Sequence, residues 1–449
     1  MTLLDRLRGH GDTAELERQI RSHARPLHRP SDLTPLMERI GEARYVLMGE
    51  ASHGTREYYT WRAEISKRLI QEKGFSFIGV EGDWPDCYQV NRFIKGDPEL
   101  GTDARAVLQC FNRWPTWMWA NEEIAELITW LREWNAGQPE ERKVGFYGID
   151  VYSLWDSLYA VLGYLSRADG KAVETALRAF RCFEPYREDP QEYAWSTMMV
   201  PTGCEQEVAR LLGEVRQQVS KAAAVPGLDG REAQFNAEQN ALVARNAEQY
   251  YRTMIRGGAE SWNLRDRHMM DTLDRLMAHH GPQARSIVWA HNTHIGDARA
   301  TDMADAGMWN IGQLAREERG GEGVVLIGFG SYRGSVIAGR SWGAPMERMP
   351  VPPAHEGSME SAMHRAGHED KLLLLTQSGA PPALGEERTH RAIGVVYNPE
   401  NERWSNYVPT LLTERYDAFL YLDRTHAVKP LHVTLHETDE PAETFPSGM

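Results

Sequence analysis

The residues best suited to chemistry are Glu50 and His53, which lie three positions apart in the glycine-bounded segment 49–54. Histidine titrates near neutral pH and is the usual general base, and a carboxylate beside it fixes its tautomer. A short apolar run, residues 45–48, precedes this segment, and a helical pattern follows it. The spacing therefore favours a catalytic turn at a strand exit, although a polar turn that caps the next helix has the same pattern.

Polar side chains also follow the other strands that we predict. In a parallel sheet the carboxyl ends of the strands lie along one rim, where ligands bind. Several titratable groups on one rim favour a catalytic groove. These residues are Glu81 and Asp83 after strand 75–80, Asp150 after strand 144–149, and His291 and His294 after strand 286–290.

The helix predicted from about Thr55 to Lys73 carries Arg62 on its apolar face, in line with Tyr58 and Leu69. A guanidinium buried without a partner is costly, so Arg62 needs a carboxylate or ligand anion, unless its charged end reaches solvent. At the rim, its charge would stabilise a developing oxyanion and disfavour a divalent cation.

These residues need an α/β fold with a mostly parallel central sheet and flanking helices. We find no convincing strand between 153 and 280, and we expect a large helical insertion over the C-terminal ends of the strands, forming one wall of the substrate cleft. The chain then divides into 1–152 and 281–449, the two halves of the α/β core, and 153–280, the insertion. We predict further strands at 44–48, 324–329 and 417–422, one helical stretch at 103–136, helices at 160–182, 205–224, 232–255 and 263–280, and joints at 185–201 and 225–230.

The composition is that of an ordinary globular protein, with 449 residues, 41% hydrophobic and 25% charged. A net charge of -14 argues against a nucleic-acid partner and an anionic membrane surface. The four cysteines form no C-x-x-C pair, which indicates reduced thiols and a cytoplasmic location. No apolar run is long enough for a membrane span, and the first residues lack a signal-peptide core.

Two other kinds of site fit parts of the sequence. G-x-S-x-G occurs at 339–343, but prolines follow where a nucleophile elbow needs a helix, so we take it as chance. By ligand type, His53, His291, His294 and a carboxylate would also suit zinc or a non-haem metal. A di-iron bundle is disfavoured because its E-x-x-H lies on a helix. A single divalent metal therefore stays open.

Six segments together resemble the erythromycin esterase family: LMGEASHGTREYYTWRAEI, FIGVEGDWPD, FYGIDVYSLWDS, SWNLRDRHMMDTL, VWAHNTHIGD and YDAFLYLDRTHAV. The resemblance implies an α/β core with an added helical region and hydrolysis of macrolide lactones by activated water, without a covalent intermediate. The family's activating histidine falls on His53 and its glutamate partner on Glu50. Its helix arginine falls on Arg62, its later histidine pair on His291 and His294, and its second-strand acid on Glu81.

We therefore predict a hydrolase of a macrolide-like ester, with a small-molecule substrate and without a cofactor. We expect metal-independent activity, with His291 and His294 as hydrogen-bond donors. We further expect Asp150, Arg265, Trp84 and Tyr58 to contact the substrate. The alternatives are a metal-dependent hydrolase of the same broad fold group and a binding protein without turnover. The sequence does not define the oligomeric state.

Overall fold

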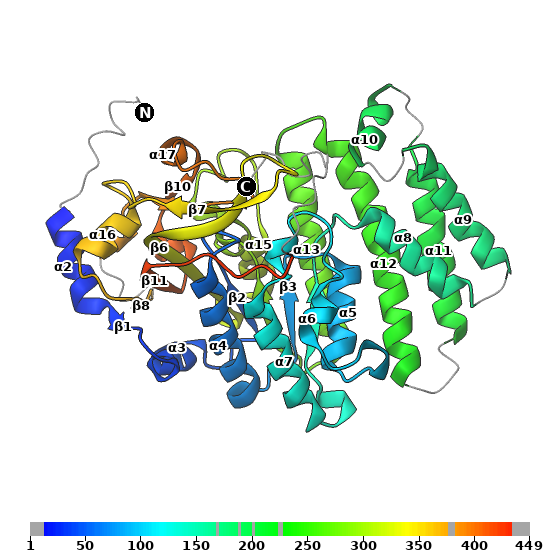
Figure 1. Cartoon of the computed structure of the whole chain (residues 1–449), viewed down its shortest axis with the longest axis horizontal. Helices are drawn as coiled ribbons and strands as arrows, with labels where there is room; N and C mark the ends of the chain where they lie inside the picture. The colour runs from blue at the N-terminus through cyan, green and yellow to red at the C-terminus, as the bar shows by residue number, and fades with distance from the viewer. Residues whose placement is uncertain are drawn as a thin grey trace.

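A mostly parallel sheet lies at the centre of the molecule (Figure 1). The computed structural model describes residues 13–167, 170–186, 190–199, 203–222, 228–375 and 382–432. Strands run in the order β1-β8-β11-β6-β2-β5-β3-β4, with β7 paired to β6. The pairs from β11 to β4 are parallel, whereas β1, β7 and β8 are antiparallel to their neighbours. This confirms the predicted fold class.

The strand bounds agree with the prediction for most of the core. The strands are β1 (Arg25–Pro26), β2 (Tyr45–Met48), β3 (Phe77–Val80), β4 (Gly145–Gly148), β5 (Ser286–Trp289), β6 (Val324–Gly339), β7 (Met346–Val351), β8 (Lys371–Leu374) and β11 (Ala418–Arg424), with a separate pair, β9 (Arg388–Arg391) and β10 (Tyr407–Thr410). The central strands are buried on both faces, which explains why they read as continuous apolar runs.

Helices cover both faces of the sheet. Successive β2 side chains point to opposite faces, so Val46 and Met48 pack with one set of helices and Tyr45 and Leu47 with the other. The first set is α3 (Thr34–Ile40), α4 (Arg56–Lys73) and α7 (Glu122–Ala136), and the second is α2 (Thr13–His23), α13 (Ala259–His280), α15 (Ile311–Arg319) and α16 (Met359–Arg365). Shorter helices are α6 (Ala104–Leu108), α14 (Asn292–Ile295), α17 (Glu402–Ser405) and α18 (Leu412–Arg415).

The predicted helical region is present, but it lies beside the sheet instead of over the strand ends. Its helices stand next to one another beyond α5 (Trp84–Ile94), which packs on the edge strand β4 (Figure 1). They share a core of their own, whereas Met269 and Leu273 of α13 belong to the core of the sheet. The helices are α8 (Leu154–Leu165), α9 (Gly170–Phe183), α10 (Pro190–Met199), α11 (Glu205–Ala222) and α12 (Leu228–Met254). The three-part division of the chain stays a prediction.

Four local predictions are wrong. β6 continues to Gly339 because its second half pairs with β7, a partner that no local pattern indicates. The stretch 103–136 is not one helix, since residues 109–121 with Pro115 separate α6 from α7. The stretch 160–182 is divided between α8 and α9. The joint 185–201 contains α10, and parts of both predicted joints, 187–189 and 225–227, lie outside the described residues.

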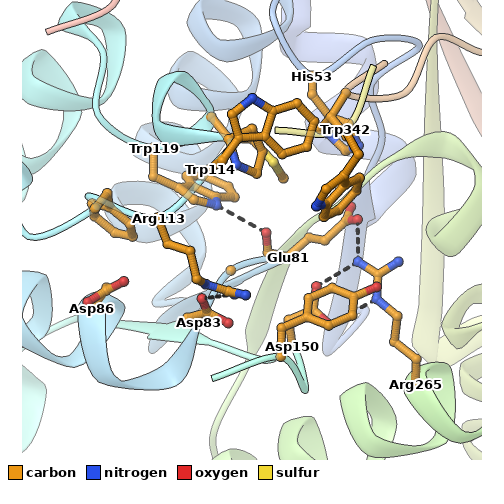
Figure 2. Close-up of a pocket in the computed structure, with 16 residues that line it drawn as sticks. His53, Glu81, Asp83, Asp86, Arg113, Trp114, Trp119, Asp150, Arg265 and Trp342 are labelled. Carbon is orange, nitrogen blue, oxygen red and sulfur yellow. Dashed lines mark hydrogen bonds and ion pairs between the residues drawn. The ribbon is translucent and has the colours of Figure 1, made fainter. Parts of the chain in front are cut away.

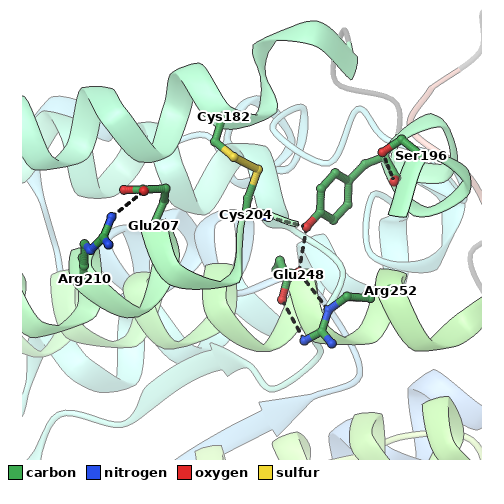
Figure 3. Close-up of a disulfide and its surroundings, with 8 residues drawn as sticks. Cys182, Ser196, Cys204, Glu207, Arg210, Glu248 and Arg252 are labelled. Atoms are coloured by element: carbon green, nitrogen blue, oxygen red, sulfur yellow. Dashed lines mark hydrogen bonds and ion pairs between the residues drawn. A yellow bond between two sulfur atoms is a disulfide. The ribbon is translucent and has the colours of Figure 1, made fainter. Parts of the chain in front are cut away.

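The prediction of reduced thiols is wrong for two of the four cysteines. Cys182 of α9 and Cys204, just before α11, form a disulfide (Figure 3). Beside it, Tyr193 of α10 donates to Glu248 of α12 and accepts from the backbone N–H of Cys204. The disulfide closes a loop within the helical region, which the spacing of the cysteines in the sequence does not reveal. The cytoplasmic location rested on reduced thiols and stays a prediction.

Among the described helices, none is both long enough and apolar enough to cross a membrane.

Candidate active site

The turn after β2 requires glycine at two positions because neighbouring segments come very close. A Cβ at Gly49 would lie 1.9 Å from the side-chain oxygen of Asn292, and one at Gly54 would lie 2.0 Å from the carbonyl oxygen of Ile337. The backbone N–H of Asn292 donates to the carbonyl of Glu50 at 2.9 Å, and that of Ile337 donates to Gly54 at 3.1 Å. The turn is thus held between the β5 exit and β6, which fixes the residues it carries.

Glu50 and His53 form the pair that their spacing predicts. Oε1 of Glu50 lies 3.0 Å from Nδ1 of His53, and both side chains are almost completely buried. A carboxylate at this distance fixes the proton of neutral His53 on Nδ1 and leaves Nε2 as an acceptor. Among the described residues we find no hydrogen-bond partner of Nε2, and His53 lines a pocket (Figure 2). His53 therefore presents a basic nitrogen toward an open space.

Arg62 pairs with the other oxygen of the same carboxylate. Its Nη2 donates to Oε2 of Glu50 at 2.6 Å, and its guanidinium lies over the rings of Tyr59 and Trp289. Arg62 is 0% exposed, which excludes a charged end in solvent. It does not line the pocket, so it stabilises the charge of Glu50 instead of placing a charge in the groove.

Arg265 of α13 lies at the centre of a second cluster. Its Nε and Nη2 donate to the two oxygens of Asp150 at 2.9 and 2.6 Å, and Nη2 also donates to Oε1 of Glu81 at 2.7 Å. Such charge-assisted, bidentate pairing is the strong form of a hydrogen bond. Burial alone would raise the pKa of the Glu81 carboxyl, but the charges of His294 and Arg265 hold this pKa well below its usual value. Glu81 is thus ionised, and both carboxylates are held by one guanidinium.

His294 lies behind Arg265 and is held by Asp266. Both carboxylate oxygens of Asp266 lie 3.0 Å from Nδ1 of His294, and Trp262 stacks on the imidazole with ring centroids 4.6 Å apart. Burial would lower the pKa of His294, but Asp266 and Glu81 outweigh it and raise this pKa to about 9. A neutral ring would accept from Arg265 at Nε2, whereas the imidazolium favoured here donates to Glu81 at 3.3 Å.

His291 has one nitrogen occupied and one without a partner. The backbone N–H of Thr293 donates to Nδ1 of His291 at 3.3 Å, and the Thr293 hydroxyl lies 2.8 Å from the same atom. Burial holds the pKa of His291 well below its usual value, so the ring is neutral and carries its proton on Nε2. This Nε2 is buried without a partner in the described part of the chain, and the rings of His291 and His53 are 5.0 Å apart. An unused donor thus lies beside the basic residue.

The pocket itself is a cavity of about 90 Å³ with an aromatic roof (Figure 2). Trp114 and Trp342 lie above Glu81 and Asp150, and Asp83 pairs with Arg113 at one side. Burial and the neighbouring Asp83 raise the pKa of Asp86 to about 8. The lining residues are His53, Glu81, Gly82, Asp83, Asp86, Phe111, Arg113, Trp114, Pro115, Met118, Trp119, Asp150, Tyr152, Arg265, Trp342 and Val395.

The structure brings most of the predicted site residues together. His53, Glu81, Asp150 and Arg265 line the pocket, and four others pack directly behind them, namely Glu50, Arg62, His291 and His294. Among the described residues of the region 153–280, Arg265 alone lines the pocket, so the described part of this region does not form a wall of the cleft.

Trp84 and Tyr58 do not line the pocket, which corrects the prediction that both contact the substrate. Trp84 is 1% exposed, stacks on Tyr147 and donates to Asn236. Tyr58 is fully buried, and its hydroxyl donates to Ser331 at 2.9 Å. Both side chains are satisfied core residues with no face toward a ligand.

Sequence reasoning missed Asp266 and the residues that build the pocket walls. Asp266 follows Arg265 directly in the segment S-W-N-L-R-D-R. Two adjacent charged residues on the buried face of a helix could have indicated that Asp266 belongs to the site. Trp114 and Trp119 lie in the stretch that we took for a helix. Trp342 lies within G-x-S-x-G, where Ser341 is exposed in a turn between two strands, which agrees with a chance motif.

Glu81, Asp150 and His294, which would suit a metal, are already engaged by Arg265. Within the described ranges, no group of three His, Cys, Asp or Glu side chains is arranged to hold a metal ion. The guanidinium of Arg265 lies between Glu81, Asp150 and His294, which are the groups that a cation would need. The arrangement of these side chains therefore fits the guanidinium of Arg265 better than a divalent metal ion.

Comparisons with known proteins agree on one family and one fold. A family model described as erythromycin esterase matches residues 70–425. Erythromycin esterase type II of Escherichia coli is 24% identical over 354 residues, which cover 75% of this chain and 81% of that protein. A succinoglycan biosynthesis protein of known structure is similar with a TM-score of 0.73 and 21% identity, over 94% of this chain and 99% of the other. A mutant of the erythromycin esterase EreC in its open conformation has a TM-score of 0.63 and 18% identity, over 92% and 99% of the two chains. At these identities the structural matches define the fold alone.

Proposed function

The chain belongs to the erythromycin esterase family, whose matching model indicates an ester hydrolase, and we propose that it cleaves a carboxylic ester by general-base activation of water. The observation that carries this proposal is the state of His53, with Nδ1 bonded to Glu50 and Nε2 open to the pocket. A general base must reach the proton that it removes, and this nitrogen is a basic atom at the cavity, oriented by its own carboxylate.

In the proposed reaction, Nε2 of His53 takes a proton from water as the water oxygen attacks the ester carbonyl carbon. The imidazolium that forms is stabilised by Glu50, whose own charge is held by Arg62. When the tetrahedral intermediate collapses, the imidazolium returns the proton to the leaving alkoxide. One water is consumed, one acid and one alcohol are released, and no bond to the enzyme forms.

The oxyanion of that intermediate needs donors that are already in place. We assign this role to the Nε2–H of His291, which lies behind the lining residue His53 and has no partner among the described residues, because a fixed donor in a site shielded from water needs no reorganisation when charge develops. Arg265 supports the same site with its positive charge, while its bonds to Glu81 and Asp150 keep it in place. His294 then acts as a positioning group for Arg265 and Glu81 instead of a metal ligand.

Isotopically labelled water provides the decisive test. The protein is incubated with a panel of simple aryl esters and macrolide lactones, the latter chosen because the named relatives are erythromycin esterases. Attack by water places the label in the product acid during the first turnover. Attack by a protein carboxylate would form a mixed anhydride, and hydrolysis of that anhydride at the protein carbonyl would give unlabelled acid in that turnover and would contradict the proposal.

The control is His53→Ala, for which we expect turnover to fall by roughly 10²–10⁴-fold if the histidine is the base. Near-normal turnover of this variant in folded form would refute the assignment. No product from any member of the panel, with tight binding of an unchanged compound, would instead support a binding protein without turnover.

Metal independence is part of the proposal and has its own test. We expect a chelator to leave activity unchanged, because Arg265 occupies the space among the candidate ligands. Loss of activity on chelation, with recovery on zinc or manganese alone, would favour the metal-dependent alternative.

A further inference from the structure

The roof of the pocket consists of two tryptophans from distant parts of the chain. Trp114 lies in the segment between α6 and α7, and Trp342 lies in the turn between β6 and β7. Their ring centroids are 4.6 Å apart, and both line the cavity that contains His53 (Figure 2). At about 90 Å³ the cavity is well below the roughly 300–1,000 Å³ typical of sites for drug-sized ligands. The roof therefore limits what can reach His53.

The two rings are anchored differently. Trp114 is 7% exposed, packs edge-on against Trp117, and donates from Nε1 to the carbonyl of Ala344 at 2.9 Å. Trp342 is only half-buried, and its Nε1 has no hydrogen-bond partner among the described residues. Trp114 is thus part of the core, whereas nothing but packing holds Trp342 in place.

The turn that carries Trp342 is exposed at its tip and tied to the rest of the protein at its base. Arg340 and Ser341 are exposed, and Gly343 has a φ of 72°, a conformation that glycine adopts without strain. At the base, the N–H of Gly339 donates to Val395 and its carbonyl accepts from Tyr397, each at 2.9 Å. Trp342 is thus carried by a turn outside the sheet, so it can be replaced without removing a hydrogen bond of a strand.

We propose that Trp342 determines substrate size, so that the protein prefers esters with a small group beside the scissile bond and excludes bulky ones, macrolactones included, while Trp342 covers the pocket. This inference rests on the proposed ester hydrolysis for its kinetic test. It adds that the size limit is set by one side chain on a turn instead of by the catalytic residues.

The kinetic test compares Trp342→Ala with the wild-type protein on p-nitrophenyl acetate and p-nitrophenyl octanoate. We expect the ratio of kcat/KM for octanoate to that for acetate to rise at least tenfold in the variant. Trp404→Ala is the matched control, because Trp404 is 84% exposed and does not line the pocket. A ratio unchanged in Trp342→Ala, or raised equally in Trp404→Ala, overturns the proposal.

A binding test separates this proposal from the proposed reaction. Benzyl methyl ketone and naphthylmethyl methyl ketone are a small and a large probe without an ester bond, so calorimetry reports pocket size even if no ester is hydrolysed. We expect Trp342→Ala to tighten binding of the larger ketone relative to the smaller at least tenfold, with Trp342→Phe in between. Equal ratios in all three proteins, or no binding to any of them, overturn the proposal whatever the esterase result.

Discussion

Two buried histidine–glutamate pairs lie on either side of Asn292, and they differ in what the second imidazole nitrogen faces. In one pair, Nδ1 of His53 bonds to Glu50 and Nε2 faces the pocket. In the other, Nδ1 of His390 lies 2.5 Å from Oε1 of Glu360, and Nε2 lies 3.2 Å from the side-chain nitrogen of Asn292, which donates to it. Both pairs are buried and consist of the same two residue types, but among the described residues only the first pair has an imidazole nitrogen that faces a cavity without a hydrogen-bond partner.

This difference shows that a buried histidine–carboxylate pair is not in itself a catalytic unit. In the second pair both imidazole nitrogens are engaged, and the backbone N–H of Arg391 also donates to Oε1 of Glu360, so the pair ties β9 to α16 and to α14. We interpret it as structural. The first pair leaves one acceptor exposed to a ligand, which is the condition that general-base chemistry requires.

The largest expected effect separates the two histidines by turnover. Replacing His53 with Gln should lower turnover by roughly 10²–10⁴-fold, whereas His390→Gln should change it by less than about threefold, because His390 does not reach a reacting atom. The measurement is kcat on the best ester of the panel, with the folded fraction checked by circular dichroism. Equal losses in both variants would remove the distinction between the pairs.

The next largest expected effect concerns Arg62, the cation that pairs with Glu50 behind His53. Arg62→Met leaves the Glu50 carboxylate buried without its cation, which should cost about 3–5 kcal/mol of unfolding free energy. Lys67→Met on the same helix breaks a partly exposed pair with Glu64 and should cost about 0–1 kcal/mol. Urea unfolding of both variants measures the difference. A small loss in Arg62→Met would mean that Glu50 is stabilised by other groups.

A third pair, His294 with Asp266, can be compared with the other two by the pH dependence of the unfolding free energy. A rise of the His294 pKa from 6.5 to about 9, at about 1.4 kcal/mol per unit, corresponds to about 3 kcal/mol of stability. Because the folded-state pKa is raised, this contribution is complete below pH 6.5 and is lost as the pH rises through 9. The unfolding free energies of wild type and His294→Gln should therefore converge between these pH values.

For His390 the sign of the pH dependence is the opposite. Burial lowers the pKa of His390 despite the nearby charge of Glu360, so its contribution is present above pH 6.5 and is lost as the pH falls below that value. The stability difference between wild type and His390→Gln should accordingly shrink on acidification. A difference that grows on acidification would show that His390 is protonated in the folded protein.

The smallest expected effect tests whether the second pair is only structural. Glu360→Gln keeps an acceptor for Nδ1 of His390 but removes the charge, and it should lower the unfolding free energy by about 0.5–1.5 kcal/mol. Turnover should stay at the wild-type value. A loss of turnover with unchanged stability would indicate that the second pair takes part in catalysis.

Local sequence patterns were sufficient for the strand exits and for the residues they carry. Apolar runs followed by polar groups placed Glu50, Glu81, Asp150 and His291 on one rim, and the spacing in the first turn paired Glu50 with His53. Helical periodicity placed Arg62 on a buried face. These features depend on residues close together in the chain. The side-chain periodicities of the helix and the strand therefore show directly which residues share a face.

Contacts between distant segments were decided by the tertiary structure alone. The position of α13 against the sheet brought Arg265 to Glu81 and Asp150, and Asp266 to His294. The pairing of β6 with β7 brought Trp342 over the pocket, and the packing of α9 and α11 brought Cys182 to Cys204. The sequence determined which side chains leave the strand ends, whereas sheet order and helix packing decided which of them meet, because no local periodicity encodes a contact between segments far apart in the chain.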